Sequence, residues 1–182
     1  MEFAETTLPG AFLVSLKKIK DDRGYFARGF CRDELQAHGL VADMLQLNVA
    51  SSLKRGTLRG MHFQARPHQE AKFVRCTQGA LFDVIIDLRK DSPTRLRWFG
   101  AELTRDNGQM LYVPEGFAHG YQTLVDDTEM YYLTTATYAA SAASGVRHDD
   151  PAFGIDWPLP VSVISEADRR WPDYSISISE RL

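Results

Sequence analysis

Three residues of the chain have the side-chain types that acid–base chemistry at a ketone requires. His62 could remove a proton next to a carbonyl group, Lys72 could stabilise the enolate oxygen, and Tyr132 could return a proton. If the base and the acid lie on opposite faces of the carbon, this exchange inverts its configuration. Each residue falls in a segment with a strand pattern, but their spacing alone does not decide whether they converge.

A second set of residues suggests metal chemistry instead. Residues 108–119 read Gly, five residues, Pro, one residue, Gly, two residues, His, which resembles the second signature of the cupin superfamily of jelly-roll barrels. Cupins often bind a metal with the counterpart of His119 and with a His-x-His pair and a Glu from an earlier strand pair. Here Gln64 stands where the second histidine belongs, which leaves His62, Glu70 and His119. Because glutamine is a poor ligand for transition metals, we expect no metal site.

Composition and charge exclude several classes of function. The 182 residues fit one domain, residues 1–182, and a net charge of −3 provides no basic surface for nucleic acid. Cys31 and Cys76 show neither metal-ligand spacing nor a disulfide framework, which fits the reducing cytoplasm. The apolar residues 10–16 precede Lys17 and Lys18 and are too short to cross a membrane, so we expect a strand there.

Strand patterns dominate the chain and helices are few. Alternating residues predict strands over residues 72–77, 81–88, 110–113, 120–124 and 129–135, and Gln78-Gly79 is typical of a hairpin turn between the first two. A short helix is expected over residues 32–38, capped by Gly39, and another from Ser165 to Arg170. Many short strands with few helices predict an all-β fold, a β-sandwich or a jelly-roll barrel.

Motifs distributed along nearly the whole chain identify a family. The sequence resembles the dTDP-4-dehydrorhamnose 3,5-epimerase family, nucleotide-sugar epimerases with a cupin-type jelly roll. The resemblance is carried by residues 22–26 (DRGYF), 46–48 (QLN), 56–64 (GTLRGMHFQ), 71–75 (AKFVR), 82–84, 87–89, 92–94, 113–120 (VPEGFAHG), 149–151, 154–158 (GIDWP) and 165–168 (SEAD).

The resemblance implies a role for each chemical group at the reacting carbons. His62 would be the base that takes the proton beside the 4-keto group, and Asp168 would pair with its imidazole and raise its basicity. Tyr132 would be the acid on the other face of the sugar, and Lys72 would stabilise the enolate. No cofactor takes part.

The family also implies a substrate-binding set and an oligomeric state. Arg59 and Arg23 would hold the diphosphate. Because the segment of Arg23 commonly reaches the partner subunit's site in this family, a homodimer is implied. The other predicted substrate-binding positions are Phe26, Arg28, Gln46, Asn48 and His119.

The sequence departs from the family pattern around the nucleotide. Arg28 stands where the family has a glutamate, Ala143 lies near another expected glutamate, and Ala167 replaces a common basic residue. Leu133 stands where the family often has a lysine. Since a buried carboxylate that pairs with a base rejects other bases, we expect the substrate to carry a nucleotide other than dTDP, or dTDP held differently.

The leading hypothesis is a cofactor-independent epimerase that acts at C3, C5 or both of a nucleotide-diphosphate 4-keto-6-deoxy sugar. One alternative is a metal-dependent cupin oxygenase or isomerase, against which Gln64 argues. The other is a barrel that binds a nucleotide sugar without catalysis. A mere binder needs no acid opposite a base, so the joint presence of His62, Asp168, Tyr132 and Lys72 favours the epimerase.

Overall fold

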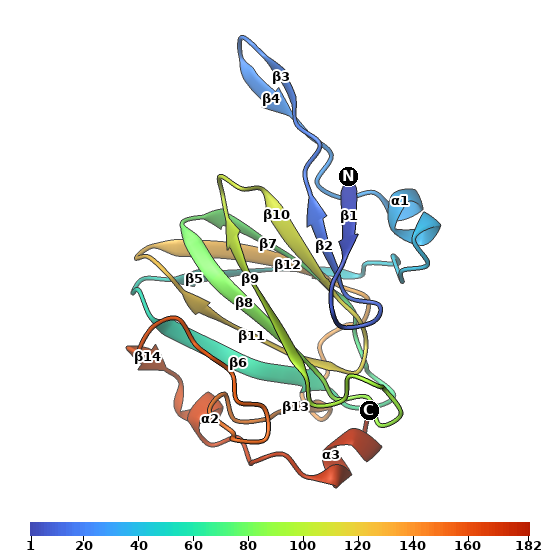
Figure 1. The fold of residues 1–182 in the computed structure, drawn as a ribbon, viewed down its shortest axis with the longest axis vertical. Coiled ribbons are helices and arrows are strands. Elements are labelled where there is room, and N and C mark those ends of the chain that lie inside the picture. The colour runs from blue at the N-terminus through green and yellow to red at the C-terminus, as the bar shows by residue number, and fades with distance from the viewer.

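Two antiparallel sheets face each other and form a jelly-roll barrel in the computed structural model, which describes residues 1–182 (Figure 1). The first sheet has the order β1 (Glu2–Glu5), β2 (Phe12–Ser15), β10 (Gln109–Val113), β7 (Lys72–Gln78), β12 (Thr128–Thr134), β5 (Gln46–Ser52). The second has the order β13 (Ala143–Gly145), β6 (Thr57–Gln64), β11 (Phe117–Thr123), β8 (Ala80–Asp87), β9 (Trp98–Thr104), and β14 (Val163–Ile164) runs parallel to β6.

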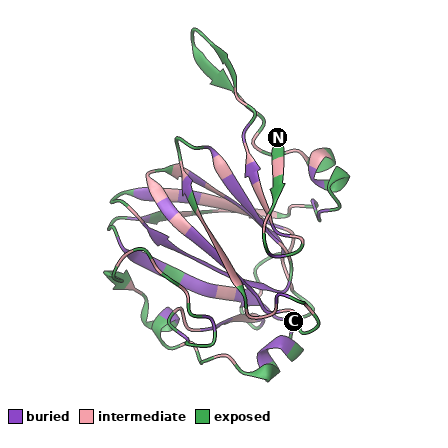
Figure 2. Ribbon diagram, viewed as in Figure 1, coloured by how far each residue is buried: buried purple, intermediate pink, exposed green.

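A small hairpin stands apart from the two sheets. Its strands, β3 (Ile19–Asp21) and β4 (Gly24–Phe26), pair only with each other and project away from the barrel (Figure 1). Both strands are exposed along their whole length, as the green hairpin in Figure 2 shows. The sequence patterns did not predict this hairpin as an element.

Three apolar clusters hold the barrel together. The first lies between the sheets and includes Val74, Ile85, Leu111 and Met130. The second covers the outer face of the second sheet with the C-terminal segment, including α3 (Ile176–Glu180). The third lies on the outer face of the first sheet, under α1 (Arg32–Ala37). Burial of these side chains supplies the main stabilising free energy of the fold.

Most predicted elements are confirmed with small shifts at their ends. The strand expected within residues 10–16 is β2, and the strands expected over 72–77, 81–88, 110–113, 120–124 and 129–135 are β7, β8, β10, β11 and β12. The helix α1 ends at Ala37, followed by Gly39 at a positive φ of 72°. In α2 (Glu166–Arg169), the Ser165 hydroxyl caps the helix by accepting from the Asp168 backbone N–H.

The predicted hairpin at Gln78-Gly79 is wrong. The β7 strand belongs to the first sheet and β8 to the second, and the two strands do not pair. Gly79 has a positive φ of 73°, as a tight turn requires, but there it carries the chain around the corner from one sheet to the other. A turn residue reports the local backbone bend and leaves the pairing of its flanking strands undetermined.

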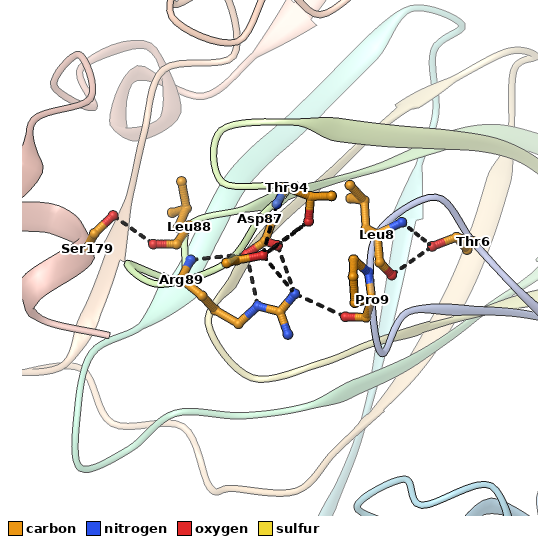
Figure 3. Close-up of polar contacts among 9 residues, drawn as sticks. Thr6, Leu8, Pro9, Asp87, Leu88, Arg89, Thr94 and Ser179 are labelled. Carbon is orange, nitrogen blue, oxygen red and sulfur yellow. Dashed lines mark hydrogen bonds and ion pairs between the residues drawn. The ribbon is translucent and has the colours of Figure 1, made fainter.

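A polar network surrounds the buried Asp87 at the end of β8 (Figure 3). The Asp87 carboxylate accepts hydrogen bonds from Arg89 Nε at 2.9 Å and from Thr94 Oγ1 at 2.7 Å. Arg89 also donates to the Pro9 carbonyl at 3.0 Å, and Ser179 donates to the Leu88 carbonyl at 2.7 Å. Burial would raise the pKa of Asp87, but the donors around it lower that pKa below its ordinary value. The network joins the β1–β2 loop, the segment after β8 and α3.

The three helices are four to six residues long, and none has the length and apolar character needed to span a bilayer.

Candidate active site

The interior face of the barrel carries most of the predicted catalytic residues. His62 of β6 lies directly opposite His119 of β11 in the antiparallel register, so both side chains project to the same face. His119 binds Asp83 of β8. Asp83 lies on the same face of β8 as Ile85, which belongs to the core between the sheets. This face is therefore the interior. Tyr132, on the opposite sheet, packs against the same core.

His62 and Asp168 form a close pair although 106 residues separate them. His62 Nε2 lies 2.6 Å from Asp168 Oδ1, and the His62 side chain is 42% exposed while that of Asp168 is 9% exposed. The local topology explains the contact. On its outer edge β6 pairs with β14 at residues 57–58 and with β13 at residues 62–64. Asp168 enters between them and accepts from the Gly60 backbone N–H at 3.3 Å.

Three donors hold the Asp168 carboxylate in place. Besides His62 and Gly60, the Trp171 indole N–H donates to Asp168 Oδ1 at 3.3 Å, and the Trp171 ring lies edge-on to His62. Burial alone would raise the pKa of Asp168, but its bond to His62 and the other donors bring that pKa below its ordinary value. The side chain is thus a carboxylate at neutral pH, suited to orienting an imidazole that accepts a proton.

Lys72 and Tyr132 lie close together across the first sheet. Lys72 Nζ is 6.0 Å from the centroid of the Tyr132 ring and 3.3 Å from Glu70 Oε1. Burial raises the pKa of Tyr132, and the negative charge of Glu70 raises it further. A phenol that stays protonated at neutral pH can donate a proton.

The potential metal ligands have other partners. His62 binds Asp168, His119 binds Asp83 at 2.8 Å, and Glu70 contacts Lys72 and Gln64. No group of three or more histidine, cysteine or acidic side chains has an arrangement that could hold a metal ion.

Polar residues of β5 and β6 extend the site from the reacting groups. Asn48 lies opposite Tyr132 in the register of β5 and β12. Arg59 donates to the Ser51 carbonyl at 3.0 Å and leaves much of its guanidinium exposed, while Gln46 Oε1 accepts from the Tyr138 backbone N–H at 2.6 Å.

The structure does not bring the remaining predicted substrate-binding residues to His62 of the same chain. Arg23 and Phe26 lie on the projecting hairpin, and the guanidinium of Arg23 binds only Asp21 there. Arg28 follows the hairpin and pairs with Glu34 of α1 at 3.0 Å. This is the arrangement expected if these residues serve a neighbouring subunit.

The departures from the family pattern fall at different depths. Ala143 of β13 pairs with Gln64, beside the interior site, whereas Ala167 is exposed on α2. Leu133 lies on the outer face of β12 and packs against the cluster under α1.

Sequence reasoning missed several residues of the site. Trp171 and Tyr138 gave no signal, because a lone aromatic residue in a loop is uninformative without its contacts. Glu70 and Gln64 were noticed only as members of a defective metal set, and the contacts of Glu70 with Lys72 and with Gln64 depend on the fold.

Comparisons with known proteins identify the family of the chain. The sequence model of the dTDP-4-dehydrorhamnose 3,5-epimerase family matches residues 5–175. The epimerase of that name from Sinorhizobium fredii is 43% identical over 173 residues, which cover 94% of this chain and 89% of the relative.

Solved structures show the same fold. The dTDP-4-dehydrorhamnose 3,5-epimerase from Bacillus anthracis, with TDP and PPi bound, superposes with a TM-score of 0.92 at 40% identity, covering 95% of this chain and 99% of the other. A 3'-monoepimerase from Streptomyces bikiniensis, in complex with dTDP-quinovose, has a TM-score of 0.85 at 32% identity, covering 97% and 88%. The chain thus belongs to the dTDP-4-dehydrorhamnose 3,5-epimerase family and is an isomerase, a carbohydrate epimerase of deoxysugar biosynthesis.

Proposed function

We propose that this epimerase inverts C3 and C5 of a dTDP-linked 4-keto-6-deoxy sugar, with His62 as the base and Tyr132 as the acid. The observation that carries the assignment is the 2.6 Å contact between His62 of β6 and Asp168 of α2, with His62 facing the interior to which Tyr132 of the other sheet also contributes. A base and an acid on facing sheets can act on opposite faces of one carbon.

The mechanism needs only side chains of the chain. His62 Nε2 is engaged by Asp168, so its Nδ1 takes the proton on the carbon beside the ketone, and the imidazolium is stabilised by the carboxylate. The electron pair moves onto the ketone oxygen, where the ammonium of Lys72 stabilises the enolate. Tyr132 then delivers a proton to the opposite face of the carbon. C3 and C5 flank the same ketone, so the same groups serve both after the ring shifts.

The nucleotide is the less constrained part of the substrate. Relatives and neighbours are named for dTDP sugars or contain TDP or dTDP, and the exposed guanidinium of Arg59 would pair with a diphosphate. Of the two outcomes expected from the departure at Arg28, we favour dTDP held differently, since Glu34 already neutralises this arginine. Calorimetric titration with dTDP, CDP, GDP and UDP tests this choice. A preference for any nucleotide other than dTDP would overturn it.

The enzyme acts as a homodimer in this proposal. Leu47 and Val49 on the outer face of β5 are 56% and 62% exposed, and Ile19 and Phe26 of the hairpin are similarly exposed. Apolar side chains left exposed on a strand face and on a projecting hairpin are typical of a subunit interface. With β5 covered by a second copy, the hairpin can bring Arg23 to the partner's site. We further infer that residues 1–182 form one domain and that the enzyme works in the cytoplasm, where free Cys31 and Cys76 stay reduced.

Deuterium incorporation tests the function directly. The enzyme is incubated in D₂O with a dTDP-linked 4-keto-6-deoxyglucose, and C3 and C5 are followed by NMR. We expect exchange and inversion at both carbons. Exchange at C3 alone would make the enzyme a monoepimerase, and exchange at neither carbon would overturn the proposed function.

A further inference from the structure

Glu70 is a nearly buried carboxylate that the mechanism above leaves without a task. Its side chain is 12% exposed, and the two oxygens have different partners. Oε1 lies 3.3 Å from Lys72 Nζ, and Oε2 accepts a hydrogen bond from Gln64 Nε2 at 3.1 Å. The Glu70 carboxylate therefore links Lys72, the proposed enolate-stabilising residue, to Gln64 of β6.

The environment of Lys72 makes this contact necessary. The Lys72 side chain is 8% exposed, and Glu70 is the acidic residue with which it forms an ion pair. A buried ammonium without a counter-charge is strongly disfavoured and either loses its proton or moves towards water. In both cases the positive charge would no longer lie beside the enolate oxygen.

Gln64 fixes the direction of the Glu70 carboxylate. Its amide nitrogen also donates to the His68 carbonyl at 3.0 Å, and its amide oxygen accepts from the Ala139 N–H at 2.7 Å. Since both ends of the amide are engaged and Gln64 is buried, the side chain cannot rotate freely. The residue that replaces a metal ligand of the cupin pattern thus anchors the carboxylate.

We propose that Glu70 is a positioning residue for epimerisation, which acts through Lys72 by holding its ammonium in place and directed at the enolate oxygen. This inference rests on the proposed function. Glu70 does not touch the sugar in this assignment. Its charge also favours the protonated form of Tyr132, which suits an acid.

A double-mutant cycle tests the proposal. Glu70→Gln preserves the shape of the side chain and removes its charge, and Lys72→Met removes the ammonium. We expect Glu70→Gln alone to slow deuterium exchange about 10- to 100-fold, a fraction of the effect typical of losing one group that stabilises an oxyanion. Its affinity for dTDP, measured by calorimetry, should stay within about twofold of the wild type because Glu70 does not contact the nucleotide. In the Lys72→Met background the same change should have no further effect.

The cycle separates a positioning role from a structural one. If the effects of the two substitutions multiply, or if Glu70→Gln exchanges as fast as the wild type, the proposal is overturned. Absence of exchange in the wild-type enzyme would overturn the proposed function and the inference with it. Exchange slowed by Lys72→Met but unaffected by Glu70→Gln would reject the inference alone.

Two further variants keep the test decisive. Glu129→Gln is the matched control, since Glu129 is a half-buried carboxylate that accepts from Thr77 at 2.9 Å and pairs with no lysine. It should exchange at the wild-type rate. If Glu70→Gln fails to fold, Glu70→Asp is the alternative variant, since it keeps the carboxylate but shortens the side chain by one methylene group. It should cause an intermediate loss of exchange that disappears in the Lys72→Met background, and an unchanged rate would contradict the proposal.

Discussion

Asn in place of Asp168 would remove the charge that faces His62 while nearly preserving shape. In the wild type, one carboxylate accepts from the imidazole at 2.6 Å, from the Trp171 indole at 3.3 Å and from the Gly60 N–H at 3.3 Å. The asparagine amide has only one accepting oxygen. If that oxygen stays with His62, the amide NH₂ meets the Gly60 N–H, and two donors then face each other.

The size of the effect follows from these contacts. Removing one partner of a buried ion pair costs about 3–5 kcal/mol. Because the His62 side chain is 42% exposed, solvent screens part of its interaction with Asp168. We therefore take the lower value, about 3 kcal/mol, as the stabilisation that Asp168 adds when His62 becomes an imidazolium. At about 1.4 kcal/mol per tenfold change in rate, Asp168→Asn should slow turnover about 100-fold.

The assay is the rate of deuterium exchange at C3 and C5, together with calorimetric binding of dTDP. We expect slowed exchange with unchanged binding, since Asp168 acts on the base and not on the nucleotide. Asp149→Asn is the control, because this exposed carboxylate pairs only with Arg147 and His148, neither of which belongs to the proposed site, and should leave the rate unchanged. Exchange by Asp168→Asn within about threefold of the wild type would refute the idea that this pair activates His62.

Three other perturbations have distinct expected outcomes. Tyr132→Phe should let His62 exchange the proton with retention of configuration and should abolish inversion, and inverted product at the wild-type rate by NMR would contradict this. The lowered pKa of Asp87 means that its stabilisation is present above the unfolded carboxyl range, about pH 4, and is lost as pH falls through the lower folded value. Asp87→Asn should therefore lower the free energy of unfolding measured with urea at pH 7, and should make that free energy depend less on pH in the acid range. An unchanged dependence on pH in the acid range would contradict this. Leu47→Glu combined with Val49→Glu should yield monomers by light scattering with lost turnover, whereas an intact dimer would reject the proposed interface.

The strands that the sequence predicted are those whose alternate side chains are apolar and face the core. The sequence patterns missed several strands, β9 and β5 among them, and the polarity of β5 is inverted. Gln46 and Asn48 alternate with the exposed Leu47 and Val49, and Asn48 lies beside Tyr132. A strand that lines a polar pocket on one face and carries an exposed apolar face on the other has no simple binary pattern, so its orientation can be known only from its neighbours.

The chemical types in the site could be predicted from the sequence, but their contacts could not. Family motifs identified His62, Asp168, Lys72 and Tyr132 as a set, and the structure brings Asp168 to His62 and Lys72 beside Tyr132. The role of Glu70 required the fold, since an acidic residue two positions before a lysine at a strand start is ordinarily solvated. Its burial depends on Gln64, a residue of a different sheet.

The distance along the chain between His62 and Asp168 has a consequence for how activity is acquired. After residue 145 only the two-residue strand β14 joins the sheets, and Asp168 reaches its place after the segment that follows residue 145 has crossed the outer face of the second sheet and docked there. Contacts between residues so far apart in sequence are entropically costly and form late in folding. A chain with a complete barrel but an undocked C-terminal segment would hold His62 without its carboxylate. Recovery of turnover during refolding would then lag behind recovery of β-structure and report the docking of this last segment.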